Sequence, residues 1–340
     1  MKVVEEMLKK VPGRVHLAFL PTPLEKAENL TSFLGGPNIF IKRDDCTGFA
    51  FGGNKIRKLE FVMGDALQKK AEVVITTGGL QSNWARQTAA AAKKLGMEVI
   101  LFLQGEKPQE FQGNLLLDKI LGCDIRFAVV DELEEEGEIK GTFPWTGKIA
   151  EEEKKKGKIP YLAAIGAANP LGNMGYITAV DELKSQLDEM KIKADYIVLS
   201  VGTGGTQAGI ELGVKLLGLK TEVIGISVSR HGMEKWDEIS ELCNETLDFF
   251  QLKNHRFTPD EIEVNMNYIG EGYAIPTKEC VEAINLVAQK EGIFLDPVYT
   301  GKGMAGLIDL VKKGRFKKDD NVVFVHTGGN TALFEYNSIF

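Results

Sequence analysis

DYIVLSVGTGGTQAG, residues 195–209, joins a buried apolar run to a glycine-rich turn and the start of a helix. The β-branched run at 195–201 predicts a strand, and the residues from about 206 predict the following helix. The turn between them carries three glycines and two threonines, namely Gly202, Thr203, Gly204, Gly205 and Thr206. A strand, a glycine turn and a helix in this order are typical of an α/β fold.

The glycine turn has the features of a binding site for one phosphate group. Its glycines let backbone amides turn toward an anion, its threonines supply hydroxyl groups, and the helix N-terminus adds a partial positive charge. The turn lacks the lysine of the GxxxxGK[ST] nucleotide loop and also departs from GxGxxG. For this stretch alone, a glycine-rich turn without a ligand is the alternative.

Outward from this stretch, β-branched runs alternate with helical segments. We predict strands at 71–77, 98–104, 123–130, 161–166, 195–201, 223–229 and 321–327, and helices at 83–96, from about 206, near 277–291 and near 303–313. This alternation predicts right-handed βαβ units and parallel sheets. The 340 residues exceed the usual size of a single core, so two domains are expected. The stretch with Pro170, Gly172 and Gly175 is a candidate crossover between two sheets.

Composition and charge argue against several classes of function. The formal net charge of −7 disfavours a nucleic-acid partner, because binding to phosphates needs a basic surface. No run of about 18 apolar residues predicts a membrane span, and residues 1–14 lack the apolar core of a secretion signal. The four cysteines form no CxxC pair and the four histidines have no metal-ligand spacing. We therefore expect a reduced, cytoplasmic setting and no metal site.

FGGNKIRKLE, residues 51–60, places Lys55 after two glycines, with Arg57 and Lys58 close behind. A lysine that lies near two other cations and is partly removed from solvent has a lowered pKa. Its amine is then nucleophilic at neutral pH and can form an imine. The alternative for this segment alone is an ordinary basic turn on the surface.

Two further turns carry side chains suited to ligand binding. TTGGLQSNWARQTAAAA (76–92) predicts a strand, a glycine turn and a helix, with Ser82 or Asn83 as the helix cap and free groups to hold a carboxylate. LDPVYTGKG (295–303) places Tyr299 on a turn, where its ring can stack on a flat ligand or fill a core. Plain helix capping and core packing are the alternatives. Together, a phosphate site, an activated lysine, a carboxylate site and a stacking tyrosine are what amino-acid chemistry with pyridoxal phosphate (PLP) requires.

Several long motifs lie in fixed order along the chain. They are IKRDDCTG…GGNKIRKLEF (41–62 region), QSNWARQTAA (81–90), GTGGTQAG (202–209), EGYAIPT (271–277), LDPVYTGKGMAGLID (295–309) and VVFVHTGG (322–329). By these motifs the chain resembles the D-cysteine desulfhydrase / 1-aminocyclopropane-1-carboxylate (ACC) deaminase family over nearly its whole length. RDDCTG together with QSNxARQTAAAA makes it similar to the L-cysteate sulfo-lyases of the same group.

The resemblance implies a fold-type II PLP enzyme, similar to the tryptophan synthase β subunit, with two domains of mainly parallel, twisted sheets. The expected large domain comprises residues 1–54 and 176–340, and the expected small domain residues 55–175. The resemblance also implies a homodimer that binds its cofactor between the two domains and acts on a small amino acid.

Roles in cofactor binding follow from the resemblance position by position. Lys55 in GGNK corresponds to the Schiff-base lysine and is the first catalytic residue. Lys58 corresponds to a residue that approaches the cofactor phosphate. Gly202, Thr203, Gly204, Gly205 and Thr206 correspond to the phosphate loop. Thr300 falls where the partner of the pyridine nitrogen is expected, a position at which ACC deaminases carry a glutamate.

The same correspondence assigns residues to the substrate. Ser82 and Asn83 match the residues that handle the substrate carboxylate and the 3′-oxygen of the cofactor. Tyr273 in EGY and Tyr299 in PVY match two tyrosines that face cofactor and substrate. Ser82 and both tyrosines are therefore expected to be catalytic, together with Lys55.

Two stretches depart from the family pattern. Trp84 follows QSN where D-cysteine desulfhydrases usually carry a histidine and ACC deaminases a glutamine, and GAAN (166–169) replaces the more usual GGSN. Both are expected to line the substrate end of the pocket, with simple helix packing as the alternative for Trp84.

The reaction implied by the resemblance is α,β-elimination from a cysteine-like amino acid, which gives pyruvate, ammonia and sulfide or sulfite. ACC ring opening, amino-acid racemisation and PLP binding without turnover are the alternatives.

Overall fold

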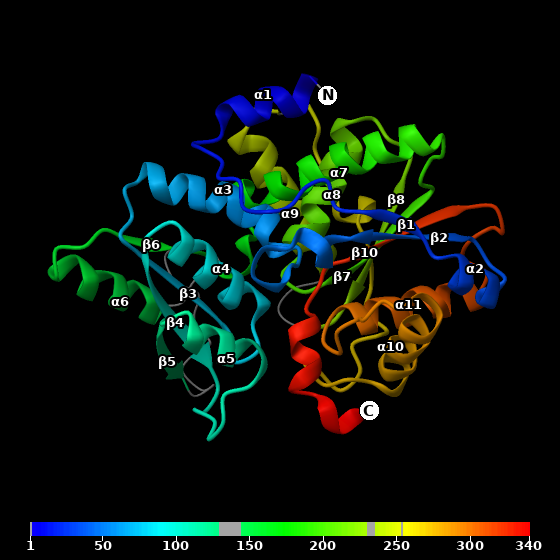
Figure 1. Ribbon diagram of the computed structural model, residues 1–340. Coiled ribbons are helices and arrows are strands. Elements are labelled where there is room, and N and C mark those ends of the chain that lie inside the picture. The colour runs from blue at the N-terminus through cyan, green and yellow to red at the C-terminus, as the bar shows by residue number, and fades with distance from the viewer. Residues whose placement is uncertain (1, 129–143, 230–234, 253) are drawn as a thin grey trace.

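Two α/β units lie side by side in the computed structural model, which describes residues 2–128, 144–229, 235–252 and 254–340 (Figure 1). The larger unit contains a six-stranded sheet with the strand order β1-β2-β10-β7-β8-β9. Its strands are β1 (Leu24–Lys26), β2 (Asn38–Arg43), β10 (Asn321–His326), β7 (Tyr196–Val201), β8 (Glu222–Ser227) and β9 (Glu263–Asn265). β1 pairs antiparallel with β2, and the other four pairings are parallel.

The smaller unit contains a four-stranded parallel sheet with the order β5-β4-β3-β6. Its strands are β5 (Asp124–Ala128), β4 (Glu98–Gln104), β3 (Val73–Gly79) and β6 (Pro160–Leu162). The α-helices of the described residues are α1 (Lys2–Lys10), α2 (Glu28–Leu34), α3 (Lys55–Gln68), α4 (Asn83–Lys94), α5 (Gly113–Ile120), α6 (Pro144–Lys155), α7 (Pro170–Met190), α8 (Gly205–Leu216), α9 (Lys235–Phe249), α10 (Lys278–Glu291) and α11 (Thr300–Lys312).

The expected α/β class with two mainly parallel sheets is confirmed. Each predicted strand has an observed counterpart, although β6 is shorter than the predicted 161–166 because a 3₁₀ turn, Ile165–Ala167, follows it. Residues 129 and 130 of the predicted strand 123–130 lie outside the described residues. All strands of the smaller sheet fall between residues 73 and 162, and those of the larger sheet fall outside this interval. Domain boundaries after residues 54 and 175 stay a prediction.

The expected crossover between the two sheets at 170–175 is confirmed, because the chain passes from β6 of the smaller sheet to β7 of the larger sheet through α7, the longest helix of the described residues. Asn169 caps this helix, because its Oδ1 accepts a hydrogen bond from Gly172 N at 2.9 Å, and Pro170 occupies the first helical position. The glycines serve close packing rather than a chain break. A Cβ atom on Gly175 would lie 2.6 Å from the backbone of Arg57, so α7 could not lie against α3 with a larger residue there.

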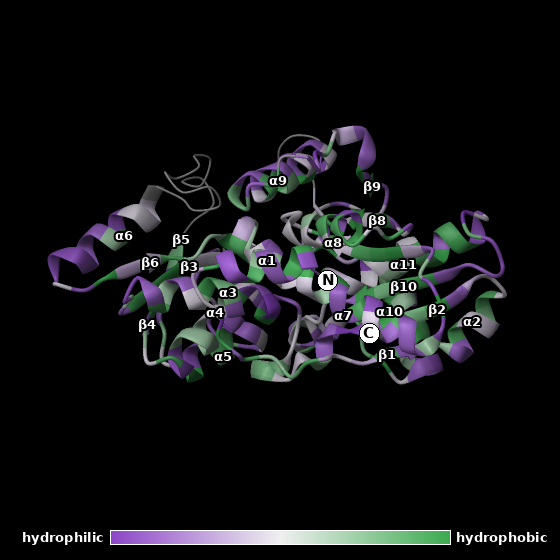
Figure 2. Ribbon diagram, turned by 90° about the horizontal axis from the view of Figure 1, so that it is seen from above, coloured by the Kyte–Doolittle hydropathy of each residue, from purple (hydrophilic) through white to green (hydrophobic). Residues whose placement is uncertain are grey.

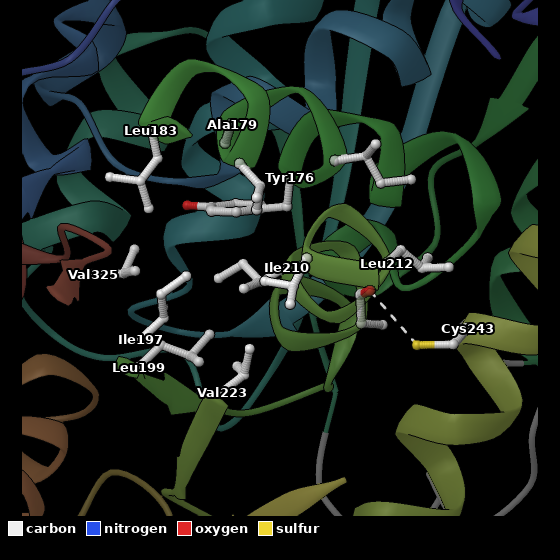
Figure 3. Close-up of a cluster of buried hydrophobic side chains, with 14 of the residues drawn as sticks. Tyr176, Ala179, Leu183, Ile197, Leu199, Ile210, Leu212, Val223, Cys243 and Val325 are labelled. Atoms are coloured by element: carbon white, nitrogen blue, oxygen red, sulfur yellow. Dashed lines mark hydrogen bonds between the residues drawn. The ribbon is translucent and has the colours of Figure 1, made fainter. Parts of the chain in front are cut away.

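Alternate residues of the four central strands of the larger sheet, β2, β10, β7 and β8, contribute to two separate cores. Ile197 and Leu199 pack with α7, α8 and α9 on one face, where Figure 3 shows them beside Tyr176 and Leu183. Val198 and the residues of the adjacent strands that point to the same face pack against α2, α10 and α11 on the other face. Because both faces are covered, the strands are continuous apolar runs, as in other parallel sheets. Figure 2 shows hydrophobic residues gathered around the strands and polar residues along the outer end of α6.

A buried ion network attaches α3 to the larger sheet and to α7. The guanidinium of Arg57 donates to both carboxylate oxygens of Asp44, at 2.9 and 2.8 Å, and to Glu182 at 3.0 and 2.8 Å. Asp44 follows β2 directly and also accepts from the hydroxyl groups of Thr22 and Tyr176. Arg57 and neighbouring Lys42 hold the pKa of Asp44 below its usual value in spite of burial. The network therefore fixes the direction in which α3 leaves the large sheet.

Replacing Asp44 by Asn should lower the free energy of unfolding by roughly 3–5 kcal/mol, because the buried Arg57 then loses its principal counter-charge. Chemical denaturation followed by circular dichroism measures this change. Asp188→Asn is the matched control, since Asp188 forms an exposed pair with Lys184 on α7 and should change stability by less than about 1 kcal/mol. Equal effects of the two substitutions would contradict the structural role of the network.

Candidate active site

The loops after β2, β7 and β10 meet at the start of α3. Asn54, the residue before this helix, donates its backbone N–H to Thr327 O at 3.0 Å and its Nδ2 to Thr206 Oγ1 at 3.1 Å. These acceptors follow β10 and β7, so one residue joins three loops. The carboxyl ends of parallel strands are where α/β folds bind ligands. Sequence reasoning did not select Asn54, although it lies in the GGNK motif.

The glycine turn after β7 has the backbone form expected of an anion site. Gly204 has a φ of +79°, and Gly205 begins α8, so the helix N-terminus opens at this turn. Thr203 lies against Gly166, where an added Cβ atom would come within 2.8 Å of Thr203 Oγ1. The five residues from Gly202 to Thr206 thus form one connected turn at the start of α3.

Lys58 reaches the same turn from α3. Its side chain is fully buried, and Nζ donates to Gly166 O at 3.0 Å. A Cβ atom on Gly205 would lie 2.8 Å from Lys58 Nζ, which places the amine directly beside the turn. Burial lowers the pKa of Lys58 well below its ordinary value, and the charge of nearby Lys55 lowers it further. Within the described ranges no carboxylate pairs with Lys58, so an anion bound at the turn would supply its missing partner.

Lys55 is the first residue of α3, one turn before Lys58 on the same face of the helix. Its side chain is only partly exposed, and loss of solvation lowers its pKa to about 8. The expected lowering is therefore present, but the expected contribution from Arg57 is wrong. Arg57 lies two residues further, and its charge is matched by Asp44 and Glu182 on another side of the helix.

A strained loop leads into Lys55. Four successive residues have positive φ angles: Ala50 at +47°, Phe51 at +65°, Gly52 at +68° and Gly53 at +117°. Arg86 donates to the carbonyl oxygen of Ala50, and Gln87 Nε2 donates to Gly52 O at 2.7 Å. Both donors belong to α4, so this helix holds the loop in a conformation that is unfavourable for L-residues. At Gly53 a Cβ atom would lie 2.5 Å from Gln87 Nε2, which excludes other residues there.

Ser82 and Asn83 begin α4 at the carboxyl end of β3. Ser82 Oγ accepts a hydrogen bond from Ala85 N at 3.1 Å, so it caps the helix and keeps its own hydroxyl hydrogen available. Asn83 Oδ1 accepts from Asn114 Nδ2 at 2.8 Å. A Cβ atom on Gly329 would lie 3.1 Å from Asn83 Nδ2, so the donor end of this amide reaches the loop after β10. Asn114 is a further residue that sequence reasoning missed.

Tyr273 and Tyr299 share a hydrogen bond between their hydroxyl oxygens at 2.5 Å. Their rings meet edge to face, with centroids 5.9 Å apart. The ring of Tyr299 lies beside the glycine turn, because a Cβ atom on Gly202 would be 3.4 Å from its Cε1. Loss of solvation raises the pKa of both phenols. Both hydroxyl groups therefore remain protonated near neutral pH.

Thr300 is bound to Asp296, a fully buried residue that sequence reasoning missed. Thr300 Oγ1 donates to Asp296 Oδ1 and accepts from Asp296 N, both at 2.7 Å. Asp296 also accepts from the backbone N–H groups of Val298, Tyr299 and Thr300. The hydroxyl hydrogen of Thr300 is thus already used within its own turn. Its role toward a pyridine nitrogen stays a prediction.

Comparison with known proteins identifies the family. The sequence pattern described as "Pyridoxal-phosphate dependent enzyme" matches residues 15–328. This chain belongs to that family. It is therefore a PLP-dependent enzyme, and the role of Lys58 and the glycine turn in binding the cofactor phosphate stays a prediction.

Several relatives are similar over almost their whole length. The chain is 41% identical over 333 residues to a "Putative 1-aminocyclopropane-1-carboxylate deaminase" of Pyrococcus furiosus, with 98% of this chain and 96% of that protein covered. It is 38% identical to the "D-cysteine desulfhydrase" of Klebsiella pneumoniae (strain 342), with 95% and 96% covered. The crystal structure of an "ACC deaminase homologue" superposes with a TM-score of 0.86 at 40% identity, covering 99% and 97%. The family expected from the motifs is thus confirmed.

The residues present fit PLP at three points. Lys55 offers an amine that is partly unprotonated near neutral pH. The turn from Gly202 to Thr206, with Lys58, could hold the phosphate. Tyr299 lies beside this turn and could cover a flat ring. Among the described residues, no group of three or more His, Cys, Asp or Glu is arranged to hold a metal ion, and none of their helices has the length and apolar character of a membrane span.

Trp84, expected at the substrate end of the pocket, lies in the core of the smaller unit, and its contact with substrate stays a prediction. Its side chain is only 3% exposed and packs in the core between the smaller sheet and its helices. Its Nε1 donates to Thr76 Oγ1 on β3 at 2.8 Å, so the indole nitrogen is also satisfied inside the core. These contacts favour the alternative interpretation, which is simple helix packing.

The GAAN stretch lies beside the glycine turn after β7. Gly166 contacts Thr203 and Lys58, and a Cβ atom on Gly205 would lie 2.9 Å from the Cα of Ala168. GAAN therefore packs against the glycine turn after β7, and its expected place at the substrate end of the pocket stays a prediction. Ala167 has a φ of +43°, where the more usual glycine would be unstrained.

In the PLP-free enzyme, the reactivity of Lys55 should rise with pH around a midpoint of about 8, since only the neutral amine reacts and burial has lowered its pKa to that value. Ordinary surface lysines titrate near ~10.4. Pulse acylation across pH 6–11, followed by peptide mass spectrometry, measures the titration of Lys55 and of the surface lysines in one sample. A Lys55 midpoint above about 10 would contradict the desolvated environment.

Replacing Gly205 by Ala should weaken PLP binding roughly ten- to a hundredfold, because a charge-assisted bond to phosphate contributes about 1.5–3 kcal/mol. The added methyl group would lie 2.8 Å from Lys58 Nζ and displace it. Fluorescence titration of the PLP-free enzyme measures the effect. Gly147→Ala in α6 is the matched control, since its Cβ atom would contact nothing within 4 Å.

Proposed function

We propose that this enzyme eliminates the β-substituent of a small, cysteine-like amino acid and releases pyruvate, ammonia and sulfide or sulfite. The observation that carries the proposal is the pairing of a lysine of pKa about 8 with a second, fully buried lysine that lacks an anionic partner. The reaction is of the D-cysteine desulfhydrase or L-cysteate sulfo-lyase type. The identity of 38% to a "D-cysteine desulfhydrase" supports the first of these.

Bound PLP supplies a ring that accepts the electron pair left when the α-proton is removed. Lys55 would hold the cofactor through its amine before the substrate binds. Its free Nζ can then accept the α-proton, because a lowered pKa leaves part of the amine neutral at physiological pH. Lys58 and the turn from Gly202 to Thr206 hold the phosphate in this proposal.

The substrate carboxylate binds at the start of α4. Ser82 keeps its hydroxyl hydrogen free while it caps the helix, so it can donate to a carboxylate oxygen. The free backbone amides of this helix N-terminus favour a negative charge at the same place. Asn83 turns its Nδ2 group toward the loop after β10, where it can donate to the 3′-oxygen of the cofactor.

Tyr273 and Tyr299 can protonate the leaving group. Their hydroxyl groups are 2.5 Å apart, so a proton given up by one can be replaced by the other. Tyr273 is 40% exposed, which connects this pair to solvent. The raised pKa of both phenols keeps the protons in place until a base such as sulfide develops.

Thr300 favours elimination over ACC ring opening, the second candidate function. Several relatives carry the ACC deaminase name, at 37–41% identity. The family resemblance places a glutamate at the Thr300 position in ACC deaminases, and a carboxylate there keeps the pyridine nitrogen protonated. A neutral hydroxyl stabilises that charge less, so it suits substrates whose leaving group departs readily. ACC has neither an α-hydrogen nor a good leaving group.

The purified enzyme, tested with D-cysteine, L-cysteine, L-cysteate, β-chloroalanine and ACC, should give pyruvate from a cysteine analogue and negligible 2-oxobutyrate from ACC. Chromatographic separation of the two keto acids distinguishes the reactions. Turnover of ACC within about tenfold of the best cysteine analogue, a barrier difference of only ~1.4 kcal/mol, would overturn the preference for elimination. Keto acid from none of the five would overturn the proposal as a whole.

The proposed enzyme is a cytoplasmic homodimer. Phe19 and Phe51 are 72% and 71% exposed on the segments around the loop that leads to Lys55, and aromatic side chains are enriched in subunit interfaces.

The free thiols of Cys46, Cys123 and Cys243 accord with a reducing compartment. Light scattering should give twice the 37.4 kDa mass of the chain.

A further inference from the structure

We propose that Asn114 is a positioning residue, which decides whether Asn83 presents a hydrogen-bond donor or an acceptor to the cofactor pocket. The inference rests on the proposed function, in which Asn83 donates to the 3′-oxygen. Asn114 is the second residue of α5 in the smaller unit, and its side chain is completely buried. It touches no substrate or cofactor atom in this proposal and acts only through Asn83.

A main-chain carbonyl fixes the orientation of the Asn114 amide. Asn114 Nδ2 donates to Gln81 O at 2.8 Å, and a carbonyl oxygen can only accept. The atom of Asn114 that faces Gln81 must therefore be the nitrogen. On the other end of the amide, Asn114 Oδ1 accepts from Thr331 Oγ1 at 2.7 Å. The backbone N–H of Asn114 donates to Gln81 Oε1 at 2.8 Å and holds the residue from a third side.

The orientation of Asn114 then fixes that of Asn83. The second hydrogen of Asn114 Nδ2 points at Asn83, at 2.8 Å, so the facing atom of Asn83 must be its oxygen. The guanidinium of Arg86 is a second donor to the same oxygen, with Nη2 at 3.5 Å. With Oδ1 held in this way, Asn83 Nδ2 is directed to the opposite side. The succession of hydrogen bonds from Gln81 through Asn114 to Asn83 thus leaves one possible amide orientation.

The directed end of Asn83 lies where the two units face each other. A Cβ atom on Gly329 would be 3.1 Å from Asn83 Nδ2 and 2.9 Å from Asp296 Cγ. Gly329 has a φ of +100° and leaves this space free of side-chain atoms. A rotated Asn83 would place an oxygen there instead of an N–H group. It would then repel the 3′-oxygen of the cofactor instead of binding it.

The bond from Thr331 to Asn114 also joins the two units. Thr331 belongs to the 3₁₀ turn Asn330–Phe334 after β10 of the larger sheet, whereas Asn114 belongs to α5 of the smaller unit. The side chain of Asn114, which orients Asn83, is therefore itself held by a hydrogen bond from the larger unit. Contact between the units and correct presentation of Asn83 depend on the same buried amide.

Replacing Asn114 by Asp tests this role, because the carboxylate can accept but no longer donate. Asn83 should then turn its Nδ2 toward the new carboxylate and its oxygen toward the cofactor. The donor that stabilises the 3′-oxygen anion is lost, so the neighbouring proton is held more tightly. The pH midpoint of the visible absorption band of the PLP-loaded enzyme should rise by roughly 0.5–1 unit, a three- to tenfold change in proton affinity.

The combination with Asn83→Ala separates orientation from charge. If Asn114 acts through Asn83, N114D should shift the midpoint in the wild-type background and leave it unchanged in the N83A background. A direct effect of the new carboxylate would persist in both, and would overturn the inference. Arg86 and Asp118, the charged groups nearby on α4 and α5, are present in every variant.

Two further variants guard against misfolding and general disturbance. Asn114→Ala frees Asn83 to adopt both orientations without a new charge, so it should shift the midpoint in the same direction by less. Asn173→Asp is the matched control, because Asn173 is also fully buried but bonds to Thr246 in the larger unit. An unchanged midpoint in both N114D and N114A, or an equal shift in N173D, would overturn the role of Asn114.

Failure of the proposed function has a different signature. Borohydride reduction and mass spectrometry of the wild-type enzyme should place the PLP adduct on Lys55. An adduct elsewhere, or none, would contradict the proposed site before any Asn114 variant is compared. With the adduct on Lys55, the midpoints of the variants test Asn114 alone.

Discussion

The buried amine of Lys58 is the constraint on which the site depends. The described chain gives this group a carbonyl oxygen but no carboxylate, so its charged form is stable only with an external anion. The glycine turn after β7 lies so close to this amine that a Cβ atom on Gly205 would collide with it. Lys55, one turn earlier on α3, lies on the same face. A phosphate at this turn therefore also brings the bound molecule to the reactive amine.

The opposite side of α3 explains how such a site can be rigid. Arg57 carries its charge into a network with Asp44 and Glu182, which ties the helix to the larger sheet and to α7. The loop before the helix is strained, and Arg86 and Gln87 on α4 hold its carbonyl groups. The same α4 begins with the residues proposed to bind the substrate carboxylate. The amine and the carboxylate site are thus positioned by the packing of two neighbouring helices.

Local patterns in the sequence predicted what depends on local structure. The strands, the glycine turn and Lys55 each have a signal within about ten residues of chain, and the structure places them as expected. The direction of Arg57 could not be predicted, because it depends on Asp44 and on Glu182, which is 125 residues away. Asn114 was missed for the same reason, since its partner Thr331 lies 217 residues further along the chain. The crossover at Pro170 and Gly172 was predicted correctly, but the long helix that forms it was not, because residues that break helices in isolation also begin and pack them.

The two stretches that depart from the family pattern are both packed inside the structure. Trp84 is enclosed in the core of the smaller unit, and GAAN supports the phosphate turn from behind. Thr300, the predicted partner of the pyridine nitrogen, gives its hydroxyl hydrogen to Asp296. Four hydrogen bonds from residues 298–300 surround that carboxylate, so its charge is stabilised within its own turn. The same turn sets Tyr299 beside Gly202. Asp296 therefore has two effects. It binds the neutral hydroxyl group of Thr300, and through the same turn it places Tyr299 beside the glycine turn.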